Sequence, residues 1–281
     1  MGVPVDPVPM GLRFDSVAKD YANYRPGYPD ELFNDLESFV GLRDTSVLEI
    51  GCGTGQATGP LLDRGCRVLA IEPGSEMAAI ARNGLSGNRF DVDVATFDDW
   101  QPGDRRFDLV VAATSFHWVD PGIRWPKVTS VLKGEGAIVL LTNRTVGGGT
   151  FDELHQRSFD LHQQYGAEAQ EEGAPTESDL SEDLQLASSD IGLLWETAEP
   201  KGGRSVAGSL FAEPILRRYP WEFDYVASDA VGLLSTYSPY LAVRPDRRRA
   251  LLAEIEELIN SRFGGRVTRR YLTILALTRC R

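Results

Sequence analysis

The chain has 281 residues, of which 42% are hydrophobic and 25% charged, and its formal net charge is −12. This length and composition fit one large globular domain, or one domain with a sizeable insertion. An acidic surface repels phosphate backbones and anionic lipid, so nucleic acid and membranes are excluded as expected partners.

The first predicted segment, residues 1–11, reads MGVPVDPVPMG and has neither a basic region nor an apolar run, so we expect a loose leader and no signal peptide. The chain has no apolar run near the ~20 residues that a membrane span needs. Its three cysteines, Cys52, Cys66 and Cys280, form no spaced framework. We therefore expect a reduced cytoplasmic protein, either a monomer or a homodimer.

Two helices are predicted next, over residues 14–24 and 30–40, on either side of a turn that contains RPGYP. Strands and helices then alternate up to Arg144, a rhythm typical of βαβ units and a parallel sheet. The five predicted strands are residues 46–51, 67–72, 90–95, 107–114 and 136–142, and the helices between them are residues 56–63, 75–83 and 122–133.

The alternation of strands and helices ends near Arg144, where TVGGGT predicts a flexible joint. An amphipathic helix is predicted over 151–165, and residues 168–190 form an acidic run without Lys or Arg, typical of a solvated surface. Later elements are strands at 215–226 and 268–280 and helices at 229–241 and 246–263. We expect three parts: an α/β core with an N-terminal lid over 1–145, a helical insertion over 146–200, and completion of the core over 201–281.

A glycine loop follows the first core strand, in the stretch VLEIGCGTGQA. Gly51, Gly53 and Gly55 would place bare backbone at a helix N-terminus, past the carboxyl ends of parallel strands, where such sheets bind ligands. Dinucleotide enzymes use G-x-G-x-x-G, but Gln56 occupies the position of the third glycine. No phosphate-binding Lys follows the loop, which excludes a P-loop.

The second core strand ends in Glu72, 21 residues past Gly51. A carboxylate at this place accepts hydrogen bonds from both ribose hydroxyls of a nucleotide. A dehydrogenase and a nucleoside-binding transferase would both have such a residue. The glycine spacing favours the transferase.

These segments, together with FDLVVAATSFHW and GAIVLLT, make the chain resemble class I S-adenosylmethionine-dependent methyltransferases. YANYRPGYP, TFDDW and SFHWVDP are similar to the small-molecule branch near trans-aconitate methyltransferase. The resemblance implies a doubly wound, Rossmann-like α/β fold with a seven-stranded, mostly parallel sheet whose last strand is antiparallel. It implies an N-terminal helical lid and a helical insertion after the fifth strand. It also implies S-adenosyl-L-methionine as cofactor and S-adenosyl-L-homocysteine as product.

The resemblance assigns roles to individual positions. The three glycines would lie under the methionine part and the ribose, Glu49 would orient the loop, and Glu72 would hold the ribose. ATFDDW matches the adenine clamp, but the usual acid aligns with Thr96, so the nearest carboxylate is Asp98. The carbonyl of Ala113 would accept from the cofactor's ammonium group. Further cofactor contacts are expected from Tyr24, Arg25, Cys52, Gln56, Pro73, Met77, Phe97 and Thr114.

Two residues are predicted to be catalytic, His117 as a candidate base and Tyr21 from the lid. His117 could instead pack against Trp118 and fix its loop. Arg25 could bind the cofactor's carboxylate or an acidic acceptor, or simply stabilise the turn at Pro26. His155 and His162 share one helix face, where they could line the acceptor pocket or pack in the core. The chain's histidines and cysteines lack metal-ligand spacing, so no metal is expected.

The sequence thus predicts a methyltransferase acting on a small molecule, most simply by O-methylation of a carboxylate or hydroxyl. C-methylation stays open, because it needs only a base. So does a non-catalytic cofactor-binding protein of the same fold. An NAD-type oxidoreductase is opposed by Gln56, and nucleic-acid methylation by the net charge and by the lack of an Asn-Pro-Pro-Tyr type motif after the fourth strand.

Overall fold

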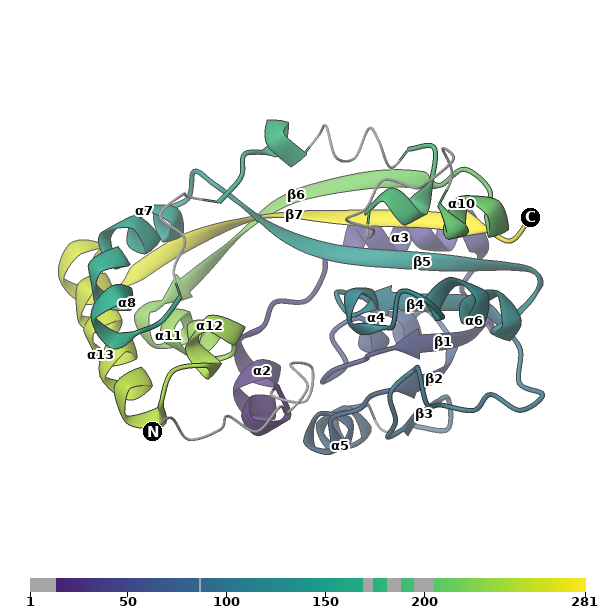
Figure 1. Cartoon of the computed structure of the whole chain (residues 1–281), viewed down its shortest axis with the longest axis horizontal. Helices are drawn as coiled ribbons and strands as arrows, with labels where there is room; N and C mark the ends of the chain where they lie inside the picture. Colours follow the sequence, from purple (N-terminus) through teal and green to yellow (C-terminus); the bar gives the residue numbers. More distant parts are fainter. Residues whose placement is uncertain (1–13, 86, 169–173, 181–187, 195–204) are drawn as a thin grey trace.

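A computed structural model describes residues 14–85, 87–168, 174–180, 188–194 and 205–281. Its centre is a seven-stranded sheet in the order β3-β2-β1-β4-β5-β7-β6 (Figure 1). The strands are β1 (Ser46–Ile50), β2 (Arg67–Ile71), β3 (Phe90–Asp93), β4 (Phe107–Ala113), β5 (Leu132–Val146), β6 (Ile215–Val226) and β7 (Arg266–Arg279). Strands β1 to β5 pair in parallel, whereas β7 runs antiparallel to both β5 and β6.

Helices cover both faces of this sheet, which is why the central strands are apolar on both sides. On one face, α3 (Asp30–Val40) and α4 (Thr58–Asp63) pack in a core that contains Phe33 and Leu61. On the other, α6 (Arg124–Val131) and α10 (Val206–Leu210) pack around Trp125 and Phe116. The predicted doubly wound, mostly parallel fold with an antiparallel last strand is confirmed.

Several predicted elements have different bounds in the structure. The helix expected over 151–165 is two helices, α7 (Thr150–Arg157) and α8 (Phe159–Tyr165), which meet at the buried Ser158. The helix expected over 229–241 is also two, α11 (Ala227–Ser235) and α12 (Ser238–Leu241), because a proline at the start of α12 cannot continue a helix. The last predicted residues of the helix over 122–133 already belong to β5.

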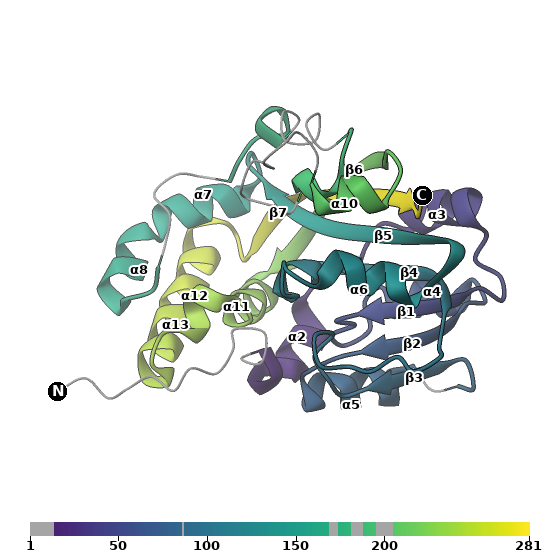
Figure 2. The same ribbon diagram turned by 45° about the vertical axis from the view of Figure 1, so that its right-hand side comes forward.

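A second lobe lies at the far ends of the long strands β5, β6 and β7 (Figures 1 and 2). It contains α7, α8, α11, α12 and α13 (Pro245–Arg262), and its apolar side chains form one cluster with Tyr225 of β6 and Tyr271 of β7. The helices of residues 227–262 therefore pack with the start of the predicted insertion. Much of the predicted acidic run, the loose leader, and residues 195–200 of the insertion lie outside the described residues.

The N-terminal segment forms a short 3-10 helix, η1 (Phe14–Val17), and α2 (Ala18–Tyr24), and it lies between the core and the second lobe (Figure 1). Helix α2 contacts both α11 of the second lobe and α5 (Ser75–Gly84) of the core. The segment therefore joins the two parts of the molecule near the carboxyl ends of the parallel strands.

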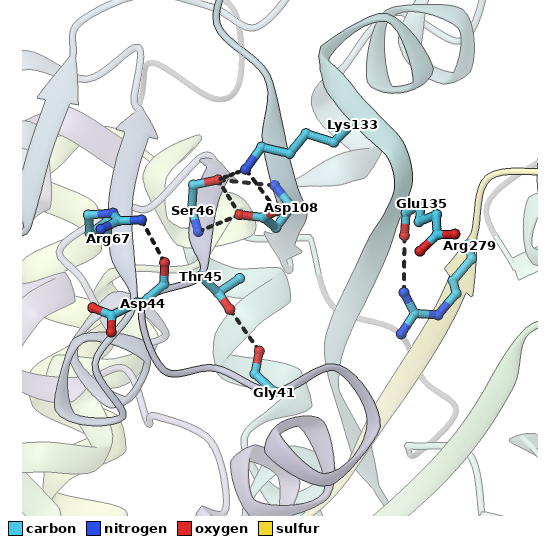
Figure 3. A network of polar contacts seen from close by, with 9 residues as sticks. All are labelled: Gly41, Asp44, Thr45, Ser46, Arg67, Asp108, Lys133, Glu135 and Arg279. Atoms are coloured by element: carbon cyan, nitrogen blue, oxygen red, sulfur yellow. Dashed lines mark hydrogen bonds and ion pairs between the residues drawn. The ribbon is translucent and has the colours of Figure 1, made fainter.

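Polar side chains at the amino ends of the strands bond to one another (Figure 3). The Asp108 carboxylate accepts from the Ser46 hydroxyl at 2.5 Å and from Lys133 Nζ at 2.8 Å. Partial burial would raise the pKa of Asp108, but the bonds from Lys133 and Ser46 together lower it to about 2. The amino ends of these strands are therefore held together by their own polar residues, whereas ligands of open parallel sheets bind at the carboxyl ends.

Candidate functional site

A cavity of about 440 Å³ opens at the carboxyl ends of β1, β2 and β4. This volume lies in the range of roughly 300–1,000 Å³ that small-molecule sites occupy. Its walls combine backbone of the glycine loop, one carboxylate from β2 and aromatic rings of the lid. The predicted site residues that line it are Tyr21, Arg25, Gly51, Gly53, Glu72, Pro73, Met77, Thr96, Phe97, Asp98, Ala113, Thr114 and His117.

The glycine loop adopts backbone conformations that only glycine tolerates easily. Gly51, Gly53 and Gly55 have φ values of +69°, +57° and +101°. A Cβ on Gly51 would lie 2.6 Å from the Cβ of Ser115, so the loop and the end of β4 are in direct contact. A Cβ on Gly55 would lie 2.6 Å from Cδ1 of Leu85, which follows α5 (Ser75–Gly84) directly, and Gly55 lines neither of the two cavities at the loop. A side chain at this position is therefore excluded by packing against Leu85.

Glu72 fastens the glycine loop to the loop after β2. Its Oε2 accepts from the N–H of Gly53 and its Oε1 from the N–H of Gly74, both at 2.9 Å. Burial raises the pKa of Glu72, and the two backbone bonds oppose that rise. Each carboxylate oxygen can accept a second hydrogen bond, so Glu72 can still accept from a ligand in the cavity it lines.

Glu49 is fully buried beneath the loop. Its Oε2 accepts from the Thr58 hydroxyl at 2.7 Å, while its Oε1 has no hydrogen-bond partner among the described residues. Burial raises the pKa of Glu49 to about 7, with the Thr58 bond opposing it. Glu49, Cys52 and Gln56 line a smaller adjoining cavity of about 120 Å³.

Cys52 does not have the properties of a nucleophile, because burial raises the pKa of its thiol well above the ordinary value.

The predicted adenine turn follows β3. The Thr96 hydroxyl donates to the Asp99 carboxylate at 2.8 Å and accepts from the N–H of Asp99, so it closes the turn. Phe97 and Asp98 line the cavity, and Asp98 Oδ1 accepts from the N–H of Asp120 at 3.2 Å. Since Thr96 is engaged within the turn, Asp98 is the better candidate to accept from an exocyclic amine.

Backbone strain marks the end of β4. Thr114 has a φ of +56°, which is uncommon for a residue other than glycine. Its hydroxyl pairs with the Tyr28 hydroxyl at 3.0 Å, and the N–H of Thr114 donates to the Leu141 carbonyl at 2.8 Å. The next hydroxyl, on Ser115, donates to the Ile50 carbonyl at the end of β1. These bonds hold the turn so that the following residues face the cavity.

His117 lies in this turn, in the short helix η2 (Phe116–Trp118). Its ring centroid is 4.6 Å from that of Trp118, and both side chains line the cavity. Desolvation lowers the pKa of His117, with smaller contributions from Arg144 and Arg124. The imidazole is therefore neutral near pH 7, the state that a general base needs. This geometry is compatible with both predicted roles of His117, as a general base and as a packing partner of Trp118.

The N-terminal segment formed by η1 and α2 is the predicted lid, and its residues Phe14 and Tyr21 line one side of the cavity. Phe14 makes edge-on contacts with the rings of Tyr21 and Trp118, at centroid distances of 6.0 and 6.2 Å. Burial raises the pKa of Tyr21, so its hydroxyl is protonated at neutral pH. Tyr24 lies elsewhere: it packs against Gly232 of α11, where a Cβ would meet its ring at 2.5 Å. The structure therefore does not bring Tyr24 to the site.

Arg25 joins the lid to the second lobe. Its Nε donates to the Thr236 hydroxyl at 2.8 Å and its Nη2 to the Thr236 carbonyl at 2.9 Å. The guanidinium lies 4.0 Å from the ring centroid of Tyr237. Arg25 and Tyr237 line both the 440 Å³ and the 120 Å³ cavities, so they form the wall between the core and the second lobe.

His155 and His162 lie in the second lobe and line a third cavity. His162 Nδ1 is 2.7 Å from the Ser158 carbonyl and Nε2 is 2.6 Å from the Tyr240 hydroxyl. A carbonyl only accepts, so Nδ1 carries the proton and the neutral ring accepts from Tyr240 at Nε2. His162 is thus a core histidine with both nitrogens engaged. Within the described ranges, no group of three or more His, Cys, Asp or Glu could hold a metal ion.

Asp15, which sequence reasoning did not identify, attaches the lid to the core. Its Oδ1 accepts from the N–H groups of Glu76 and Met77, at 2.8 and 3.0 Å, at the start of α5. The cap is supplied by another element, because Gly74 at the N-cap position of α5 has no side chain to cap it. No local signal identifies this role, since Asp15 acts on a helix some 60 residues away.

Replacing Asp15 by Ala is expected to weaken S-adenosylhomocysteine binding about three- to thirtyfold, because loss of a cap costs ~0.5–2 kcal/mol and frees the lid. Calorimetry would measure the affinity. Asp20→Ala is the matched control, since Asp20 lies in the same segment and no described hydrogen bond joins its side chain to α5. Equal losses in the two variants would contradict the role given to Asp15.

Comparison with known proteins agrees with this geometry. Residues 47–136 match the family model of a methyltransferase domain. An uncharacterized methyltransferase of Mycobacterium tuberculosis H37Rv is 34% identical over 134 residues, covering 48% of this chain and 53% of the relative. A malonyl-[acyl-carrier protein] O-methyltransferase of Acetivibrio thermocellus is 31% identical over 158 residues, covering 54% of each chain. The chain thus matches about half the length of these relatives.

Solved structures show the same fold over a larger share of the chain. A structure presented as a candidate type II methyltransferase of Anaeromyxobacter dehalogenans has a TM-score of 0.54 at 23% identity, covering 91% of this chain and 98% of its own. Residues 47–136 thus match a methyltransferase domain, and the chain shares its Rossmann-like fold with this structure. The structure has no helix, in the ranges it describes, that is long and apolar enough to cross a membrane.

Proposed function

We propose that the chain is an S-adenosylmethionine-dependent methyltransferase that methylates an oxygen of a small molecule. The observation that supports this most is the 440 Å³ cavity, which joins the glycine loop, Glu72 and Asp98 at the carboxyl edge of the sheet. The methyltransferase domain over residues 47–136 supplies most of that edge. The related O-methyltransferase favours oxygen as the methylated atom.

The residues present fit such a cofactor. The unpaired Glu49 Oε1 and the remaining lone pairs of Glu72 offer acceptors for an ammonium group and for ribose hydroxyls. Gly51 and Gly53 bring the backbone close to the cavity, with no side chain between. The apolar rings of Phe97 and Phe14 offer surfaces against which the adenine ring of the cofactor can pack.

When bound, the cofactor would supply a methyl group on a positively charged sulfur; a bond from the acceptor lone pair to the methyl carbon would form as the carbon–sulfur bond breaks and the neutral thioether leaves. The protein's task is mainly to align and to exclude water, because effective molarity supplies most of the rate in such a transfer. His117 faces the cavity as a neutral imidazole and can take the proton that a hydroxyl acceptor loses. Tyr21 and Trp118 line the cavity, where they would shield a bound methyl donor and acceptor from water.

Carbon methylation would use the same base and is the second candidate, favoured only by the position of His117. A dinucleotide oxidoreductase is opposed by Gln56, whose Nε2 donates to the Thr54 hydroxyl at 2.8 Å. The narrower similarity to the trans-aconitate branch remains a prediction.

The test is transfer of label from methyl-labelled S-adenosylmethionine to a metabolite extract, analysed by mass spectrometry. We expect one or a few small products that carry the label on oxygen. Binding of S-adenosylhomocysteine without any labelled product would favour a non-catalytic binding protein, and label on carbon would favour the second candidate.

A further inference from the structure

A third cavity, of about 680 Å³, lies in the second lobe. It adjoins the candidate cofactor site, because Tyr237 lines all three cavities and Thr145 lines both this one and the 120 Å³ cavity. Aromatic rings and the two histidines of α7 and α8 form much of its wall. A molecule in this cavity would therefore lie on the far side of Tyr237 from the glycine loop.

Arg269 of β7 lies where these cavities meet. Its Nη1 donates to the Tyr237 hydroxyl and its Nη2 to the Thr145 hydroxyl, both at 2.9 Å. The guanidinium lies 4.6 Å from the ring centroid of Phe151 and 5.6 Å from that of Tyr271. Its Nε is buried and has no hydrogen-bond partner among the described residues. The planar guanidinium is thus fixed between aromatic rings and retains N–H groups that can donate to a ligand.

No carboxylate of the described residues forms an ion pair with Arg269, whereas its neighbour Arg270 pairs with Glu177 at 3.3 Å and Glu222 at 3.1 Å. The tyrosines around Arg269 do not supply the missing charge. Burial raises the pKa of Tyr225 to about 12, so its hydroxyl is neutral at pH 7. Arg269 is partly buried, and removing a cation from water without a counter-charge costs free energy that an anionic ligand would offset.

Two carboxylates line the same cavity and could compete for Arg269. Asp152 is already engaged, because its Oδ1 accepts from the N–H of Ala174 at 3.1 Å. Glu168 is exposed to solvent. Neither of these two carboxylates forms an ion pair with Arg269 in the described part of the chain, and the cavity of about 680 Å³ has room for a further carboxylate.

We infer that this cavity is the acceptor site and that Arg269 anchors a carboxylate of the acceptor. The inference rests on the proposed function and adds the substrate class to it. A carboxylate can accept paired hydrogen bonds from a guanidinium, and here the guanidinium is held between the rings of Phe151 and Tyr271. The anchored end lies beyond Tyr237, so the methylated oxygen belongs to the part of the molecule that passes Tyr237 toward His117.

The test measures binding of benzoate, with phenyl phosphate and benzamide for comparison, to the full chain saturated with S-adenosylhomocysteine. We expect benzoate to raise the Tm of the native protein and benzamide to leave it unchanged. Arg269→Gln should weaken benzoate binding about tenfold or more, as loss of a charged hydrogen-bond partner does. Arg269→Lys, which keeps the charge, should lose less. Arg266→Gln is the matched control, because Arg266 is exposed on the same strand.

Several outcomes would overturn the inference: no benzoate response in the native protein, an equal response in Arg269→Gln, or binding of phenyl phosphate alone. If Arg269→Gln does not fold, Arg269→Lys decides the matter: it should bind benzoate more weakly than the control Arg266→Gln does, and an affinity equal to that of the control would overturn the inference. Failure of the native protein to bind S-adenosylhomocysteine would instead count against the proposed function, and that affinity is measured first.

Discussion

Gly51→Ala is expected to weaken S-adenosylhomocysteine binding by about a hundredfold or more. A left-handed conformation at φ +69° costs a non-glycine residue ~1–2 kcal/mol. The added Cβ would also lie 2.6 Å from the Cβ of Ser115. Ser115 cannot move away easily, because its hydroxyl is bonded to the Ile50 carbonyl and the residue is buried. The loop must therefore shift away from the ligand.

Calorimetry measures this loss, and thermal unfolding shows whether the variant is folded. Gly84→Ala is the matched control: Gly84 is the last residue of α5, and a Cβ there would meet nothing within 4 Å. That variant should bind as the native protein does and be equally or more stable. A Gly51→Ala protein that binds within threefold of the native affinity would remove the glycine loop from the site.

His117→Ala is expected to lower turnover ~10²–10⁴-fold on an acceptor that must lose a proton, such as a hydroxyl or a carbon acid. On a carboxylate acceptor the loss should stay within about tenfold, because no proton is removed in the step. The affinity for S-adenosylhomocysteine should change little in either case. The comparison therefore reports the chemistry of the acceptor as well as the role of His117.

The pH profile provides an independent check. Desolvation, aided by Arg144 and Arg124, lowers the pKa of His117 below its ordinary 6.5. A base acts in its deprotonated form, so the rate on a hydroxyl acceptor should be flat above pH 6.5 and fall only below the lowered pKa. His117→Asn, which keeps a polar side chain, should lose that dependence. A tenfold loss or less on a hydroxyl acceptor would show that His117 only packs against Trp118.

The parts of the fold that could be predicted from sequence are those set by local pattern. Apolar strands, the glycine spacing and Glu72 lie within one continuous βαβ unit, so their arrangement follows from chain order. The helix over 30–40 has the predicted bounds, because Asp30 opens it and Gly41 follows its end. The break between α11 and α12 was missed, although Pro239 is the residue type that signals it.

The residues that depend on tertiary packing could not be predicted. Asp15 caps a helix in another part of the chain. Tyr237 and Arg269 meet only because β7 begins in the second lobe, where its first residues lie beside the end of β5. Tyr24 was predicted to contact the cofactor because the resemblance places the N-terminal segment over it. Tyr24 is the last residue of α2 and packs against Gly232 of α11 instead, although residues three apart, such as Tyr21 and Tyr24, ordinarily share a helix face.

The most direct test of the central claim is calorimetric titration of the full chain with S-adenosylhomocysteine, S-adenosylmethionine and NAD. We predict saturable binding of the first two at one site per chain and none of NAD. Glu72→Ala should weaken that binding by ~1–3 kcal/mol, since the ribose hydroxyls lose a charged partner. Tight binding of NAD with no response to S-adenosylhomocysteine, or an unchanged affinity in Glu72→Ala, would contradict the assignment of the 440 Å³ cavity as the cofactor site.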